Sequence, residues 1–305
     1  MESERDNAIK LLERNRVGVI MRVFAESPGA VEHQVSSAMD AVRRVLQLRT
    51  GDRATFARVD LIVSSDPDYD DTDCGLTAEE LRTRVRAEFP NAPVHVSELK
   101  KGDIYCMLLN YGVANQLEDR VSYSVMLSHG VSSYATQENV DALLSAMYRK
   151  ARVAGVAISE LRELVTKGYT MDTFAIWHNK SLVTVGGFDL RASKPRREHK
   201  HAHPKVTGWS ETKAGRHGDG AVEYHVAGCE EVIPLIRMVK NFGPCIRVVE
   251  PKGVGMEWNE ANPDIDPYAY HRHLAKLATK VDRLHRMALI EGSPLEIIES
   301  GLMHD

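Results

Sequence analysis

The sequence predicts an α/β fold, a mainly parallel sheet with helices on both faces. Its first half alternates short, nearly continuous apolar runs with segments whose apolar residues recur every three or four positions. The first pattern is typical of strands buried on both faces, and the second of amphipathic helices. This alternation favours a parallel sheet with crossover helices. The chain of 305 residues, 43% hydrophobic and 27% charged, has an ordinary globular composition.

The first elements can be placed in chain order. A strand is expected at residues 17–24 (VGVIMRVF), followed by a helix over 31–46. A second strand at 59–63 leads into the acid-rich turn SSDPDYDDTD. A helix from about 77 to 88 comes next, because Thr77 is followed three residues later by Glu, the spacing of a capping box.

The alternation continues through the rest of the chain, with one long interruption. The segment 191–220 is polar and rich in Lys, Arg, His and Gly, which predicts a surface loop or insertion. The remaining expected elements are strands at 94–97, 122–127, 153–158 and 245–249, and helices within 101–117, around 140–151, after residue 224 and over about 267–290.

These elements suggest three parts in one chain. Residues 1–16 are expected to form an N-terminal helical extension, 17–250 the main α/β domain, and 251–305 a C-terminal helical extension. The loop at about 191–220 belongs to the main domain.

Composition and motifs exclude several functional classes. The formal net charge of −4 gives no reason to expect nucleic-acid or membrane-surface binding. No apolar run approaches the roughly 20 residues of a membrane helix, and the N-terminus lacks a secretory signal, so we expect a cytoplasmic protein. The cysteines have no zinc-type spacing, and neither GxGxxG nor a P-loop follows the first strand.

A resemblance to a known family rests on two motifs in the second half. Residues 185–189 read VGGFD, and the segment 172–177 (DTFAIW) precedes them. Glu230-Glu231 follows, with Leu235, Arg237 and Gly243 spaced behind it. In this order, the motifs resemble those of GT-A-fold, nucleotide-sugar-dependent glycosyltransferases of the family 2 type. The resemblance covers roughly residues 17–250.

The resemblance implies catalytic roles for the two glutamates. An inverting glycosyltransferase needs a carboxylate base for the acceptor hydroxyl, and Glu231 matches the second acid of the family's pair, with Glu230 beside it. The sequence leaves inversion and retention both open. The alternative for Glu231 is ordinary stabilisation of the first turn of a helix, where carboxylates are favoured.

The resemblance also places binding residues at the carboxyl ends of strands, where open α/β sheets bind ligands. The nucleotide is expected at Phe24, Glu26, Asp66 and His129, and the acceptor or sugar at Trp177, Asp172 and Asp189. Alternatives remain for several: a solvated acidic turn at Asp66, a loop histidine without ligand at His129, and a core position for Trp177.

One departure from the family concerns the metal. The resemblance implies Mg²⁺ or Mn²⁺ held by an Asp-x-Asp after the central strand, where this chain has Ser128-His129-Gly130. His271 and His273 remain weak candidate ligands, and the metal residues cannot be assigned. The histidines at 199, 201 and 203 suit either a solvated basic loop or the closure of that loop over an anionic ligand.

Three functions follow in order of preference. The first is a glycosyltransferase acting on a nucleotide-sugar donor and a carbohydrate or other hydroxyl acceptor. The second is a catalytically inactive GT-A-like protein that binds nucleotides or sugar nucleotides. The third is a sugar nucleotidyltransferase, disfavoured because residues 25–29 (AESPG) carry no basic residue after the first strand.

Overall fold

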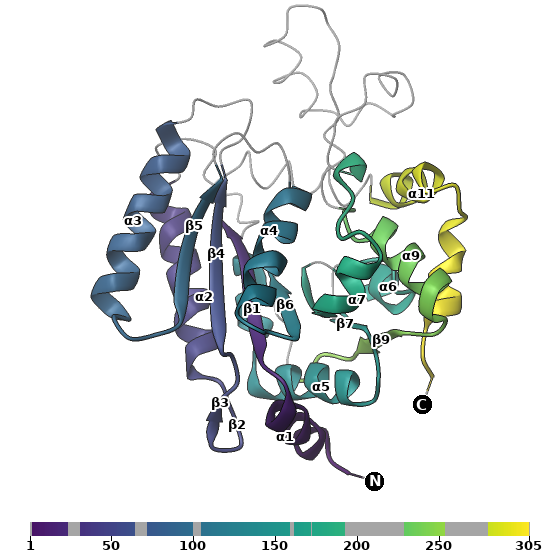
Figure 1. Ribbon diagram of the computed structural model, residues 1–305, viewed down its shortest axis with the longest axis horizontal. Helices are drawn as coiled ribbons and strands as arrows, with labels where there is room; N and C mark the ends of the chain where they lie inside the picture. Colours follow the sequence, from purple (N-terminus) through teal and green to yellow (C-terminus); the bar gives the residue numbers. More distant parts are fainter. Residues whose placement is uncertain are drawn as a thin grey trace, which may run out of the picture.

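A mainly parallel sheet lies at the centre of the protein in the computed structural model (Figure 1). The structure describes residues 2–23, 31–64, 72–99, 105–158, 162–171, 173–192, 229–253 and 280–304. Within these ranges seven strands follow the order β5-β4-β1-β6-β8-β7-β9. They are β1 (Val17–Val23), β4 (Arg58–Ser64), β5 (Val94–Leu99), β6 (Tyr123–Leu127), β7 (Val153–Val156), β8 (Phe174–His178) and β9 (Ile246–Val249).

The sheet changes winding direction at β1. From β1 the chain adds β4 and then β5 on one side, and it returns to place β6 on the other side, all in parallel pairs. Such a reversal is a topological switch point, where ligands bind beyond the carboxyl ends of the strands. Strand β8 is antiparallel to both of its neighbours, β6 and β7. The predicted α/β fold with a mainly parallel sheet is confirmed.

Helices cover both faces of this sheet, and each face has its own apolar core (Figure 1). One face packs against α2 (Val31–Gln47), α3 (Thr72–Glu88) and α5 (Gln137–Tyr148). The other packs against α4 (Tyr105–Glu118), α6 (Arg162–Thr166), α7 (Asn179–Thr184), α9 (Val232–Phe242) and α11 (Lys280–Ile290).

The burial of β1 on both faces explains why its sequence is apolar at nearly every position. Val19 and Met21 belong to the core under α2, whereas Ile20 belongs to the core under α4. Because successive side chains point to opposite faces, both sets of positions must be apolar. Helix α4 approaches very closely, since a Cβ atom added at Gly112 would lie 2.9 Å from Ile20 Cγ2.

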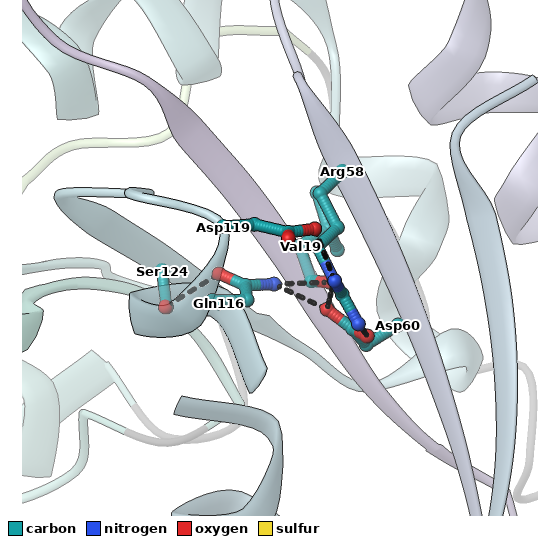
Figure 2. A network of polar contacts seen from close by, with 6 residues as sticks. All are labelled: Val19, Arg58, Asp60, Gln116, Asp119 and Ser124. Atoms are coloured by element: carbon teal, nitrogen blue, oxygen red, sulfur yellow. Dashed lines mark hydrogen bonds and ion pairs between the residues drawn. The ribbon is translucent and has the colours of Figure 1, made fainter. Parts of the chain in front are cut away.

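A buried polar network ties β1, β4, α4 and β6 together near the amino-terminal ends of the strands (Figure 2). Asp60 of β4 is fully buried and accepts hydrogen bonds from Arg58 Nε at 2.9 Å and Nη2 at 2.7 Å. Gln116 Nε2 donates to Asp60 Oδ2 at 2.9 Å and to the Val19 carbonyl at 3.0 Å. Ser124 Oγ donates to Gln116 Oε1 at 2.6 Å, so each polar group in the network has a partner.

The same arginine reaches a second carboxylate at the edge of the network. Arg58 Nη1 donates to Asp119, whose side chain is 46% exposed. This hydrogen bond holds the pKa of Asp119 below its usual range.

The terminal segments pack onto the main sheet domain. Helix α1 (Glu4–Arg14) begins with a capping box between Ser3 and Asp6, and it lies against α5, where Asn7 Nδ2 donates to Ser145 Oγ at 3.0 Å. The turns η7 (Leu295–Ile297) and η8 (Glu299–Gly301) follow α11. The division into a main domain and two extensions stays a prediction.

Some elements differ from the expectation. Helix α3 begins at Thr72, so the capping box at Thr77 is wrong, and Thr77 is buried inside the helix. Helix α9 begins at Val232, later than expected, and the last helix is described only from Lys280. Short elements that the periodicity did not predict are β2 (Arg49–Thr50), β3 (Arg53–Ala54), η2 (His129–Tyr134) and η4 (Leu190–Ala192), together with α6, α7 and β8.

Among the described helices, none combines the length and the apolar character that a membrane-spanning helix needs.

Candidate active site

Arg22 stands at the carboxyl end of β1, at the switch point of the sheet. It is the one charged residue in a strand that reads VGVIMRV. Strand geometry places Arg22 on the same face as Ile20, which is the face that α4 covers. Its side chain is 25% exposed, whereas its atom Nη1 is buried.

Two consecutive glutamates approach this strand end from the segment before α9. The side chains of Glu230 and Glu231 are both fully buried. Glu230 Oε1 lies 3.7 Å from Arg22 Nη1, and Glu231 Oε1 lies 3.3 Å from Lys280 Nζ at the start of α11. The predicted pair therefore joins three elements that are far apart in the sequence.

The alternative for Glu231, ordinary stabilisation of the first turn of a helix, stays open. Glu231 is the residue that precedes the first turn of α9, but its side chain makes no capping hydrogen bond. The carboxylate faces Lys280 instead, so its role depends on the packing of α9 against α11.

The surrounding charged side chains affect the pKa of the neighbouring Cys229 thiol. Burial raises the pKa of its thiol to about 12, while the positive charges of Lys280 and Arg283 oppose the rise. The two glutamates raise the pKa further. These groups therefore lie close together, and we use the name charged cluster for Arg22, Glu230, Glu231, Lys280 and Arg283.

Glu230 has an unusual environment for a buried carboxylate. Neither of its carboxylate oxygens has a hydrogen-bond partner within the described ranges, although the Arg22 guanidinium lies at ion-pair distance. Buried charges in proteins are normally both paired and hydrogen-bonded. A carboxylate that departs from this rule marks a candidate functional position.

The GGFD motif has a structural explanation that connects it with the second motif. Gly186 and Gly187 have φ of +91° and +70°, values that favour glycine. Asn110 of α4 then holds Phe188 by two hydrogen bonds: its amide donates to the carbonyl at 2.8 Å and its oxygen accepts from the backbone N–H at 2.9 Å. The turn is thereby fixed to α4.

Asp189 completes this connection. Arg237 Nη2 of α9 donates to Asp189 Oδ2 at 2.9 Å and to Glu291 Oε2 at 2.8 Å, while Arg237 Nε donates to Glu291 Oε1. The two motifs that carried the resemblance thus meet through Asp189 and Arg237. This contact explains both residues structurally, and acceptor binding by Asp189 stays a prediction.

Trp177 lies in the core under α9. It is fully buried, its indole Nε1 donates to the Met171 carbonyl at 2.7 Å, and its ring packs against Phe188 at 5.2 Å. A ring in this position offers no exposed face on which a sugar could stack. The sugar-binding role therefore stays a prediction without structural support.

His129 lies just after β6, at the switch point as expected, but it faces α2. Its ring atom Nδ1 lies 2.9 Å from Ser37 Oγ, and only 7% of the residue is exposed. The charged cluster lies on the opposite face, under α4 and α9. The structure does not bring His129 together with the two glutamates.

Several predicted residues lie outside the described ranges. These are Phe24, Glu26, Asp66, Asp172, His271 and His273, together with the histidine-rich loop. Within the described ranges, no three His, Cys, Asp or Glu side chains gather in a group that could hold a metal ion.

Three members of the charged cluster were not predicted from the sequence. Arg22 had a signal, because a lone charge inside an otherwise apolar strand is costly to bury. Lys280 and Arg283 had none, since basic residues in an amphipathic helix look like ordinary surface residues until α11 is seen against α9.

Comparisons with known proteins give distant structural similarities. No family model and no curated protein matches the chain. Similar solved structures include glucosyl-3-phosphoglycerate synthase from Mycobacterium tuberculosis with Mg²⁺ and uridine diphosphate, at TM-score 0.45 and 10% identity, covering 96% of this chain and 85% of that one. The same enzyme with Mn²⁺, UDP-glucose and glycerol 3-phosphate gives TM-score 0.44 and 10% identity, covering 96% and 86%.

These neighbours are GT-A-fold glycosyltransferases, the class that the two motifs resemble. At TM-scores below 0.5 the likeness carries no argument about the ligands or activity of this chain.

Proposed function

We propose that this protein is a glycosyltransferase that moves a sugar from a nucleotide-sugar donor to a hydroxyl acceptor. The observation that carries the proposal is the charged cluster at the switch point, where two consecutive, fully buried glutamates face cations from β1 and α11. Costly buried charges at the ligand-binding edge of an α/β sheet favour a catalytic site over a structural one.

Glu231 acts as the base in this proposal. Its carboxylate accepts the proton of the acceptor hydroxyl while the acceptor oxygen bonds to the anomeric carbon of the donor. The bond from that carbon to the diphosphate breaks, and the nucleoside diphosphate leaves with the electron pair. Lys280, at 3.3 Å, favours the ionised form of Glu231 and so keeps the base ready before the acceptor binds.

Five of the seven ligand contacts that the sequence predicts beyond the cluster are kept in the proposal. Phe24, Glu26 and Asp66 follow the central strands and are proposed to contact the nucleotide, while Asp172 and Asp189 are proposed for the acceptor. A cytoplasmic location also stays a prediction.

A divalent metal does not fit the described residues. The cluster contains two carboxylates and three cations, and no group of metal ligands occurs within the described ranges. Positive side chains next to the carboxylates oppose the binding of a second cation. We therefore derive no step through a metal.

The test of the base is Glu231→Gln, which keeps the shape of the side chain and removes its basicity. We expect sugar transfer to fall by about 100- to 10,000-fold, the usual contribution of a general base. Glu88→Gln, at the exposed end of α3, makes the same change away from the site and should leave the rate unchanged. Full turnover by Glu231→Gln with an intact fold would remove Glu231 as the base.

The second candidate function is binding without catalysis. It is favoured by Ser128-His129-Gly130 after β6, where the resemblance implies metal-binding acids. A thermal-shift panel of nucleoside diphosphates and nucleotide sugars, with and without Mn²⁺, separates the two. A ligand at 100 times its Kd adds about 2.7 kcal/mol of stability. Stabilisation without turnover of any donor supports the binding protein, and no stabilisation counts against both functions.

A further inference from the structure

Arg22 occupies a position that the catalytic roles above do not use. It is at the carboxyl end of the central strand, at the switch point, and on the α4 face of the sheet. The other six residues of this strand are apolar or glycine, so burying part of an arginine among them lowers the stability of the fold. Such a residue is retained where its charge has a function. Its partly exposed side chain is the part of the Arg22–Glu230 pair that meets solvent, because Glu230 is fully buried.

Glu230 is placed to orient this arginine. Its carboxylate approaches Nη1 of Arg22 from the buried side, at 3.7 Å. A guanidinium is planar and carries its N–H donors in a fixed fork, so a carboxylate beside it restrains the orientation of the whole group. Glu230 holds Arg22 from the buried side of the pair, and Arg22 is the member that meets solvent at the carboxyl end of β1.

We propose that Arg22 binds the diphosphate group of a nucleoside diphosphate, and that Glu230 is the positioning residue that orients its guanidinium. Arginine binds phosphate oxygens through two parallel hydrogen bonds, which suits this geometry. The choice of ligand rests on the proposed function.

The experiment is calorimetric titration in buffer containing EDTA, which does not depend on turnover. The ligands are UDP, GDP, ADP and CDP, with inorganic pyrophosphate and glucose 1-phosphate as smaller phosphate sources. The variants are Arg22→Met, Arg22→Lys and Glu230→Gln. Arg43→Met, in an exposed ion pair between α2 and α3, is the matched control.

We expect Arg22→Met to weaken nucleoside diphosphate and pyrophosphate binding by about 10- to 100-fold, the usual range for a hydrogen bond to a charged group. Arg22→Lys should fall in between, because lysine keeps the charge but not the fork. Glu230→Gln should weaken the same two ligands less than Arg22→Met, while Arg43→Met changes nothing. Arg22→Lys keeps the charge and most of the length, so it tests the inference even if Arg22→Met does not fold.

Three results would overturn the inference. One is equal nucleoside diphosphate affinity in the wild type and both Arg22 variants, and a second is Arg22-dependent binding of glucose 1-phosphate alone. Absence of any phosphate binding by the wild type would also reject it. Arg22-dependent diphosphate binding without transfer from any donor would refute the transferase and leave the anion site standing.

Discussion

The two ends of the central strands each bury a carboxylate, but the two carboxylates differ in their hydrogen bonding. Near the amino-terminal ends, the Asp60 carboxylate accepts hydrogen bonds from Arg58 and Gln116, and the amide of Gln116 is itself fully engaged (Figure 2). At the carboxyl end, Glu230 has an arginine at 3.7 Å and no hydrogen-bond partner within the described residues. Both carboxylates are fully buried, on the face of the sheet that α4 covers.

This difference separates a structural role from a functional one. A completely hydrogen-bonded buried network holds its elements in a single arrangement, and removing one member is costly. A buried carboxylate without hydrogen bonds reduces stability, and it persists in a fold where it serves binding or catalysis. We therefore expect mutations at the two ends to affect stability very differently.

The largest effect is expected at Asp60. Asp60→Ala leaves the Arg58 guanidinium, only 11% exposed, without its main partner. We expect the free energy of unfolding to fall by about 3 to 5 kcal/mol, as when one partner of a buried pair is removed. Urea denaturation followed by circular dichroism measures it.

Asp119→Ala is the matched control, because it removes the exposed carboxylate from the same arginine. A much smaller loss is expected there, because solvent screens an exposed ion pair. Equal losses from the two variants would mean that the buried network is no more important than a surface ion pair.

A smaller effect is expected from Gly18→Ala. A Cβ atom at Gly18 would lie 2.5 Å from Gln116 Oε1, so the amide must move away from its partners. We expect a loss of about 1 to 3 kcal/mol, the usual cost of overpacking. In a Gln116→Ala background the obstruction is gone, so the same substitution should cost less. A double-mutant cycle with no coupling between the two sites would contradict this explanation.

The smallest effect is expected at Glu230. Glu230→Gln removes a buried charge that accepts no hydrogen bond from the described residues, so the melting temperature should stay the same or rise, with a change in stability within about 1 kcal/mol. Asp60→Asn makes the equivalent change in the complete network and should lower the melting temperature. If both variants lose the same stability, the contrast between the two ends is wrong.

Secondary structure was predicted best from the sequence where buried side chains recur at a regular spacing. The apolar run of β1 and the stripe of α2 were predicted because every position there faces a core or solvent in a regular order. The helix start predicted at Thr77 was wrong because a capping box is only a local signal. Helix α3 begins five residues earlier, and Thr77 is buried within it. The direction of β8 was beyond prediction, since pairing with β6 and β7 is set by tertiary contacts.

The site could be predicted only in part, for a related reason. Glu230 and Glu231 were found through the motif that they belong to, and both are indeed buried beside cations. The partners could not be found, because Arg22 is more than 200 positions away along the chain and Lys280 depends on how α11 meets α9. The contact between Asp189 and Arg237 shows that motif residues can be spaced for each other as well as for a ligand.

The segment after α11 has a consequence for self-association. Strand β9 is the last strand of the sheet, and an uncovered outer strand offers free backbone groups with which a second chain can pair. Here the Cys245 N–H donates to the Gly301 carbonyl at 2.8 Å, and the Met303 N–H donates to the Ile246 carbonyl at 2.8 Å. These final residues occupy the start of the strand's outer side, so a chain shortened before Gly301 would expose there a template for edge-to-edge aggregation.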